Sequence, residues 1–290
     1  MSAGDKFFDR VRRLTITALF SDDMLFEHLV LKGGNAITLA HGLGLRASLD
    51  LDFSLASDFS NAAEAGRRAQ LALEKRFSTE GFTVIDYKFE ARPVVDGVDE
   101  RPWWGGYRIE FKLLPTDHYE RLNEKPHKRS IESLPLGPAQ QRTLSVDISK
   151  HEVVDGHLEQ DLDHFTIRVY SPTMVVAEKL RALCQQMPGY DLRGGQRARA
   201  RDFHDIYLVV TEAAVDVCSE ESVELVRAMF KAKRVPLELL QQLEAHRNFH
   251  RPDWPNVVSA VPETLKDYDF YFDFVLQQVH PLNEKLFGGV

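Results

Sequence analysis

The sequence predicts an α+β protein, with a mixed β-sheet core flanked by helices over residues 1–170 and a helical bundle over residues 171–290. Segments that alternate apolar and polar residues predict strands in the first part, among them LDLDFSL, FTVIDYKFEAR and RTLSVDISKHE. From Ser171 onward the pattern of apolar and polar residues changes. Ser171 is a favourable N-cap, Pro172 suits the first helical position, and the remaining chain has almost wholly helical periodicity.

The elements are expected in the following order. Residues 5–30 have helical spacing of apolar residues, and residues 35–41 form a short helix after two glycines. A strand over residues 49–55 follows, then a helix over residues 60–80 that Gly81 ends. Strands are expected over residues 82–92, 106–114, 142–152 and 164–170, with a proline-rich excursion over residues 115–138 before the third of these.

Composition is that of a globular protein with a large core. Of its residues, 43% are hydrophobic and 28% charged, and its length of 290 residues predicts two domains, or one large domain with an appendage. No apolar run approaches the roughly 18 residues of a membrane span, and the N-terminus does not resemble a signal peptide. Cys184 and Cys218 lack metal spacing, so we expect free thiols and a cytoplasmic location without a membrane partner.

The formal net charge is −8, which argues against a protein that binds nucleic acid over much of its surface. A local basic channel remains open, because steering depends on where the charges lie.

Asp50 and Asp52 are the first candidate site residues. Residues two apart on a strand point to one face, so both carboxylates lie together while Leu51 and Phe53 pack behind. Close carboxylates repel unless a cation neutralises them, and Mg²⁺ favours a pair of carboxylates together with substrate phosphates. The pair therefore indicates a metal–nucleotide site. The alternative is the polar side of an ordinary amphipathic strand.

Asp147 is the candidate third carboxylate. It lies in another predicted strand, between Val146 and Ile148. A two-metal phosphoryl-transfer site needs a third acid, which completes the metal cluster or accepts the proton of the attacking hydroxyl. Taken alone, Asp147 is also typical of a solvated position in an edge strand.

Gly33, Gly34 and Asn35 are candidates for phosphate binding. The glycines permit a tight turn, and the helix that starts near Asn35 presents unpaired N–H groups to an anion. The alternative is an ordinary glycine-containing helix entry. A glycine pair about 15 residues before a strand with two aspartates is more specific than either part.

The stretch KGGNAITLAHGLGLRASLDLDFSL resembles the signature of the AbiEii/AbiGii-type nucleotidyltransferases, the toxins of type IV toxin–antitoxin systems. Their motif is approximately KGGTAL, an apolar stretch, then R-x-S-x-DLDF. The residues that match it are Lys32, Gly33, Gly34, Arg46, Ser48, Asp50, Leu51, Asp52 and Phe53. The sequence departs at Asn35, where the family usually has Ser or Thr, so a role that needs a hydroxyl does not transfer. The resemblance implies a nucleotidyltransferase fold and adds Ser48 to the nucleotide-binding candidates.

Lys179 and Asp202 are the candidates from the helical part. In the resembled family, a Lys in an EKLRAL-like helix faces the nucleotide phosphates, and the late motif R-x-x-D-x-x-D-[IL]-Y supplies an Asp to the active site. The alternative for Lys179 is a surface lysine paired with Glu178. Asp205 shares the face of Asp202 and is expected to hold an arginine or a helix end.

Four arginines precede Asp202 and form the densest basic cluster of the chain. They are Arg193, Arg197, Arg199 and Arg201. We consider two interpretations equally: a contact surface for RNA phosphates, and a solvated, partly ion-paired helix entry.

The residues and the resemblance together predict Mg²⁺- or Mn²⁺-dependent transfer of a nucleoside monophosphate from an NTP to a hydroxyl. The resemblance implies tRNA 3′ ends as the acceptor and a cognate antitoxin as partner. Two alternatives remain open. One is modification of a protein side chain or small molecule, which the net charge suits slightly better, and the other is a non-catalytic nucleotide-binding protein.

Overall fold

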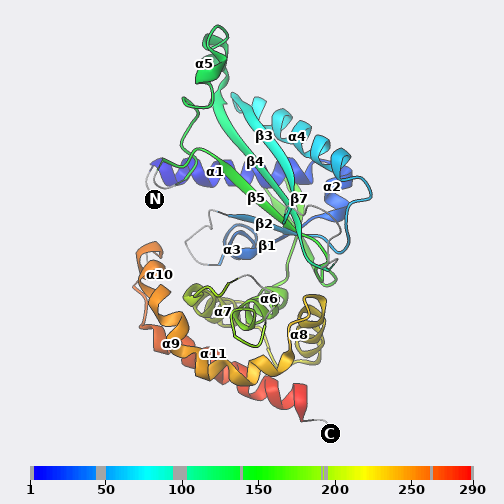
Figure 1. Cartoon of the computed structure of the whole chain (residues 1–290), viewed down its shortest axis with the longest axis vertical. Coiled ribbons are helices and arrows are strands. Elements are labelled where there is room, and N and C mark those ends of the chain that lie inside the picture. Colours follow the sequence, from blue (N-terminus) through cyan, green and yellow to red (C-terminus); the bar gives the residue numbers. More distant parts are fainter. Residues whose placement is uncertain are drawn as a thin grey trace. The chain divides into compact units, whose positions relative to one another are not determined.

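The fold is taken from a computed structural model that describes residues 3–43, 50–93, 103–137, 140–190, 192, 195–261 and 264–288 (Figure 1). By their contacts these residues form two compact units. The first contains residues 3–40 and 50–169, and the second contains residues 41–43 and the described residues from Tyr170 onward. No helix among the described residues is long and apolar enough to cross a membrane.

The first unit is built on a mixed sheet whose seven described strands have the order β3-β4-β5-β2-β1-β7-β6. Their bounds are Val30–Lys32 (β1), Leu51–Ser54 (β2), Phe82–Arg92 (β3), Gly106–Pro115 (β4), Leu144–Ser149 (β5), Leu158–Leu162 (β6) and Phe165–Val169 (β7). The pairs β2–β5 and β1–β7 are parallel, and the other neighbours are antiparallel.

One face of this sheet is apolar and is covered by two long helices, α1 (Ala3–Phe20) and α4 (Ala62–Ser78). Phe77 of α4 contacts Phe111 of β4, with ring centroids 5.7 Å apart, and Phe20 of α1 contacts Phe53 of β2 at 5.8 Å. Because successive side chains of a strand point to opposite faces, the charged residues of β2, β4 and β5 lie on the other face of the sheet.

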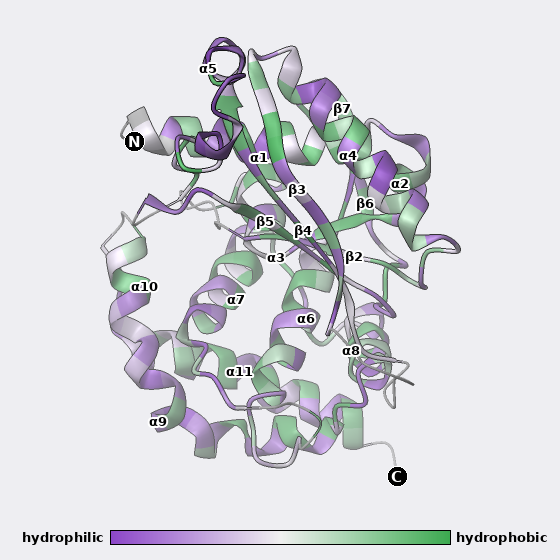
Figure 2. Cartoon of the chain, turned by 45° about the horizontal axis from the view of Figure 1, so that its top comes forward, coloured by the Kyte–Doolittle hydropathy of each residue, from purple (hydrophilic) through white to green (hydrophobic). Residues whose placement is uncertain are grey.

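The second unit is helical. Its α-helices are α6 (Pro172–Cys184), α7 (Ala200–Glu212), α8 (Glu220–Ala232), α9 (Arg247–His250), α10 (Trp254–Ala260) and α11 (Tyr268–Phe287), with 3₁₀ segments at Leu237–His246 and Arg251–Asp253. Hydrophobic and hydrophilic residues are interspersed along α6, α7 and α8 (Figure 2), as expected for amphipathic helices that bury one side. Ser171 caps α6 as predicted, since its Oγ accepts from the N–H of Met174. The predicted fold class, a mixed sheet with a helical C-terminal part, is confirmed.

The single helix predicted over residues 5–30 is wrong. Asp22 caps a second helix, α2 (Asp23–His28), by accepting from the N–H of Leu25. The chain is extended from Leu29 and forms β1, which pairs with β2 and β7 and has all three of its residues buried. A fully buried strand has no polar alternation, so its residues resembled a helix continuation.

Two further details differ from the prediction. Strand β6 was missed, and the excursion over residues 115–138 contains a short helix, α5 (Thr116–Arg121), and a 3₁₀ turn at Pro126–Lys128. The short helix expected over residues 35–41 begins at Gly33 as α3 (Gly33–Asn35) and continues as a π-helix over Ala36–Ala40.

Candidate active site

A tight turn joins β1 to α3 and brings the chain against Asp52. Gly33 has φ +69°, a backbone conformation that residues with a side chain rarely adopt. A Cβ placed on Gly33 would lie 2.7 Å from Oδ2 of Asp52. Glycine is therefore required here for two reasons: the backbone conformation, and the close approach of the Asp52 carboxylate.

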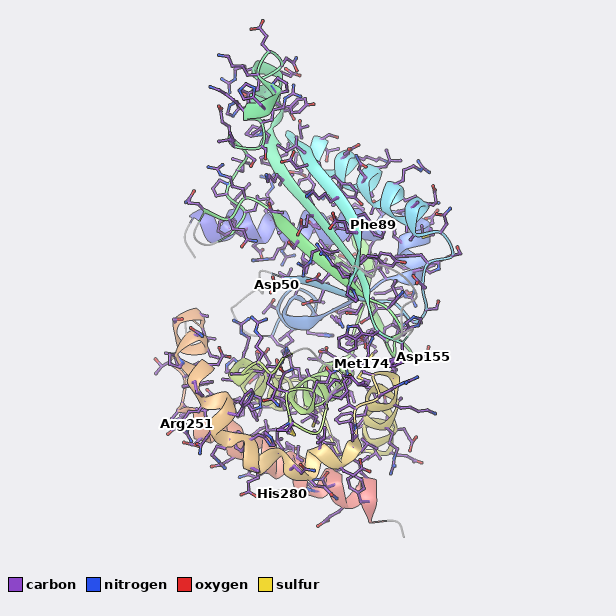
Figure 3. All side chains as sticks on the ribbon, in the orientation of Figure 1. Asp50, Phe89, Asp155, Met174, Arg251 and His280 are labelled. Atoms are coloured by element: carbon purple, nitrogen blue, oxygen red, sulfur yellow. The ribbon has the colours of Figure 1, made fainter. Side chains whose placement is uncertain are left out.

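Asn35 ties this turn to the start of β2. Its side-chain Nδ2 donates to the backbone carbonyl of Asp50 over 2.7 Å, and the residue is fully buried. Asp50 itself is exposed at the point where the chain enters β2 (Figure 3). The residue at which this chain departs from the family motif thus holds the backbone of a candidate metal ligand, which a shorter Ser or Thr side chain could not reach in the same way.

Charged side chains form a row across the polar face of the sheet. Lys32 is the register partner of Asp52, Asp52 of Asp147, and Asp147 of Arg108. Partners in register share one face, so the structure brings two of the predicted carboxylates together as direct neighbours on parallel strands.

Arg108 is a residue of this row that the sequence analysis missed. Its Nε donates to Oδ1 of Asp147 over 2.7 Å, and its Nη2 donates to Oδ2 over 3.0 Å. These hydrogen bonds, more than any other cause, raise the pKa of the Arg108 guanidinium. Alternation in GYRIEFKLL places Arg108 on the polar face, but the register that sets it opposite Asp147, 39 residues away, cannot be read from the sequence.

Lys32, the first residue of the resembled motif, is the buried end of the same row. Its Nζ lies 3.4 Å from Oε1 of Glu152, and both side chains are less than one-tenth exposed. Burial of an isolated charge is costly, so Glu152 compensates Lys32. Glu152 was not predicted as a site residue.

The donor chemistry at Asp50 and Asp52 fits a hard divalent cation. Two carboxylates at the start of β2, of which Asp50 is exposed, are what Mg²⁺ takes when phosphates and water complete its shell. In the described part of the chain, no group of three or more His, Cys, Asp or Glu residues converges as a metal site. Asp147 adjoins Asp52 through the sheet register, but its carboxylate oxygens accept from Arg108.

Lys179 lies in the helical unit and is 5% exposed. Its Nζ lies 3.0 Å from Oδ1 of Asp202 and 2.6 Å from Oδ2 of Asp205. The alternative of a surface lysine is wrong, because Lys179 is buried and is held by Asp202 and Asp205. The partner expected for Asp205 was an arginine or a helix end, and Lys179 takes that place.

Buried charges in this cluster shift each other's pKa. Burial works against every charged form, but Asp202 and Asp205 raise the pKa of Lys179 above its usual range. In the same way, burial opposes ionisation of Asp202, yet Arg199 and Lys179 hold its pKa below the usual range, and Lys179 does so for Asp205. All three groups are therefore charged at neutral pH.

The predicted basic cluster is only partly described. Arg199 forms an ion pair with Asp202 at the start of α7, which agrees with the helix-entry interpretation for this residue. Arg197 is exposed and Arg201 is partly exposed. Arg193, together with Ser48 and Arg46 of the resembled motif, lies outside the described residues.

A family model and solved structures match most of the chain. The family model described as "Nucleotidyl transferase AbiEii toxin, Type IV TA system" matches residues 16–278. A nucleotidyltransferase structure from H. pylori is 15% identical, with a TM-score of 0.52 over 99% of this chain and 97% of that chain. MenT4, a nucleotidyltransferase toxin from Mycobacterium tuberculosis, is 16% identical, with a TM-score of 0.55 over 96% of this chain and 83% of that chain.

At these identities the two structures establish the fold, which is that of nucleotidyltransferases. No curated protein matches the chain.

Proposed function

Because this chain belongs to the AbiEii family of nucleotidyl transferase toxins of type IV toxin–antitoxin systems, we propose that it is a Mg²⁺-dependent toxin that modifies tRNA 3′ ends. The family makes it a nucleotidyltransferase that uses an NTP and has an antitoxin partner. The metal, the acceptor and the cytoplasmic site of action belong to the proposal.

The observation that carries the proposal is the arrangement around Asp52. Gly33 brings the turn after β1 against its carboxylate, and Asp147 is its register neighbour on β5. Asp50 immediately precedes β2, and its backbone carbonyl accepts from Asn35. A phosphate-binding turn beside paired carboxylates suits phosphoryl transfer to a hydroxyl.

In the proposed reaction, the acceptor hydroxyl oxygen forms a bond to the α-phosphorus of the NTP. The bond from that phosphorus to the bridging oxygen breaks, pyrophosphate leaves, and the hydroxyl loses its proton. Asp50 and Asp52 would hold Mg²⁺, which neutralises the phosphate charge when bound. Gly33, Gly34, Asn35 and Ser48 would bind the nucleotide, and Asp147 would accept the proton or complete the metal shell.

The helical unit supplies separate proposals. Lys179 would neutralise triphosphate charge, a role for which its fixed positive charge is suited, and Asp202 would keep it charged and in place. Arg193, Arg197, Arg199 and Arg201 would contact RNA phosphates, with Arg199 also held by Asp202.

Transfer of label from α-labelled NTPs to total tRNA and to total protein tests the proposed acceptor. We expect label on tRNA, in the presence of Mg²⁺ only. Label confined to protein would contradict the tRNA proposal and favour the alternative that the net charge of −8 suits slightly better.

Induction of the chain in growing cells tests the toxin proposal. Wild type is expected to arrest growth and Asp50→Ala is not. Equal toxicity of the two would show that nucleotidyl transfer is not its source.

A further inference from the structure

We infer that Arg108 takes the place of a second metal ion beside Asp147, so that this active site binds a single divalent cation at Asp50 and Asp52. The inference rests on the proposed function and makes it more specific. It assigns Arg108 as a positioning residue and removes Asp147 from the metal ligands.

The contact between Arg108 and Asp147 engages both carboxylate oxygens. Two nitrogens of the guanidinium donate to the two oxygens, at 2.7 and 3.0 Å. Such two-fold, charge-assisted pairs are the strongest hydrogen-bonded contacts that carboxylates make with protein groups. A metal ion at Asp147 would have to displace or share both of these bonds.

The sheet keeps the two residues together. Arg108 and Asp147 are direct register partners on the antiparallel strands β4 and β5, and β5 is paired with β2 on its other side. The two side chains are 38% and 39% exposed. Exposed ion pairs are usually weak, but ideal two-fold geometry on a rigid frame is the recognised exception.

Asp50 and Asp52 suffice as protein ligands for one cation. Arg108 occupies both carboxylate oxygens of Asp147. One or two carboxylates with substrate phosphates are the usual protein contribution to a Mg²⁺ site, so Asp50 and Asp52 provide for one ion.

Other charged residues of the site also interact electrostatically with Arg108. The charges of Glu110 and Asp50 contribute to the raised pKa of its guanidinium, after the larger effect of Asp147. Its positive charge therefore acts on one of the two carboxylates left for the metal as well as on its own partner.

Titration of the full chain with Mn²⁺, with unbound Mn²⁺ measured by electron paramagnetic resonance, tests the inference without any turnover. Wild type is expected to bind one ion, and Asp52→Asn to bind none. Arg108→Gln releases a third carboxylate and is expected to bind two ions. The double variant Arg108→Gln/Asp147→Asn, which removes both charges and keeps the size of the residue 147 side chain, is expected to return to one.

Arg251→Gln is the matched control. Arg251 forms a comparable two-fold pair with Asp269, at 2.7 Å for both contacts and with similar exposure, in the helical unit. Its loss is expected to leave Mn²⁺ binding unchanged.

Two bound ions in the wild type, with one lost in the double variant, would overturn the inference and leave the proposed function standing. A single ion in Arg108→Gln would also overturn it. If Arg108→Gln fails to fold, the wild type and the double variant still decide between one ion and two. A wild type that binds no Mn²⁺ and transfers no nucleotide would instead contradict the proposed function itself.

Discussion

At the scale of single residues, the backbone conformation of Gly33 determines how closely the turn approaches the candidate metal ligand Asp52. Alanine at this position requires a positive φ, which costs about 1 to 2 kcal/mol, and it also displaces the Asp52 carboxylate. Since groups that orient a metal ligand are worth about 10- to 100-fold in affinity, Gly33→Ala should weaken Mn²⁺ binding by that range.

Gly81→Ala is the control, because Gly81 has φ +79° with no atom near its missing side chain. It should carry the same backbone strain and leave Mn²⁺ affinity intact. Equal Mn²⁺ affinity in the two variants would show that contact with Asp52 is unimportant.

Lys179 is the residue on which the helical unit depends most. Replacement by Met leaves Asp202 and Asp205 buried without their shared cation. We expect a loss of about 3 to 5 kcal/mol in the free energy of unfolding, measured by urea denaturation at pH 7. Lys231→Met, at an exposed position of α8, should change it by no more than about 0.5 kcal/mol.

This cluster also predicts the sign of a pH effect. Asp202 and Asp205 have lowered folded pKa values, so their contribution to stability is present above the ordinary value of 3.8 and is lost as pH falls through the folded values. In Lys179→Met, burial without the cation raises both pKa values, and protonation relieves the variant. The stability difference between wild type and variant should therefore shrink as the pH falls from 7 toward 4. A difference that grows in acid would contradict this account.

Asn35 has a structural role that the motif comparison did not predict. The sequence could only mark it as a departure from the resembled motif, whereas the structure shows its amide holding the Asp50 backbone. Asn35→Ser should lose this hydrogen bond and about 0.5 to 1.5 kcal/mol of stability, the usual net contribution of one hydrogen bond. Unchanged thermal stability in Asn35→Ser would show that Asp50 is held by other contacts.

At the scale of elements, local periodicity predicted β2, β3, β4 and β5, because each has one buried and one polar face. It failed for β1, whose three residues are all buried. Local spacing proposed Asp50, Asp52 and Asp147 as site residues, and the family resemblance added Lys179 and Asp202, but neither pointed to Arg108 or Glu152. Those two act through partners 39 and 120 residues away, and such pairs depend on register and packing rather than on local spacing.

The close packing of α4 on β3 can be tested by substitution at Gly66. Gly66 of α4 leaves no room for a side chain, since a Cβ there would lie 2.8 Å from the ring of Phe89, which is stacked on Tyr107. Alanine favours a helix by about 1 kcal/mol over glycine, but overpacking costs about 1 to 3 kcal/mol. Gly66→Ala should therefore lower the urea midpoint, and Phe89→Leu in the same chain should recover part of the loss. A raised midpoint in Gly66→Ala alone would show that α4 can move away from β3.

At the scale of the whole molecule, an overall charge of −8 has to be reconciled with a polyanionic acceptor. If Arg197 and Arg201 contact tRNA phosphates, the double variant Arg197→Gln/Arg201→Gln should raise KM for tRNA without changing KM for the NTP. It should also flatten the dependence of log KM on log salt concentration by about 1 per lost contact. Arg67→Gln, at an exposed position on α4, is the control. An equal rise in both KM values would place these arginines at the nucleotide instead.

The most direct test of the account is the rate of nucleotidyl transfer from labelled NTP to tRNA, in wild type, Asp52→Asn and Asp163→Asn. Asp163 is an exposed carboxylate paired with Arg13, outside the charged row of the sheet. We predict that Asp52→Asn lowers the rate at least about 100-fold, because the phosphate charge then lacks its bound cation, and that Asp163→Asn keeps the wild-type rate. Transfer by Asp52→Asn at the wild-type rate would contradict the central claim that this chain catalyses transfer at Asp50 and Asp52.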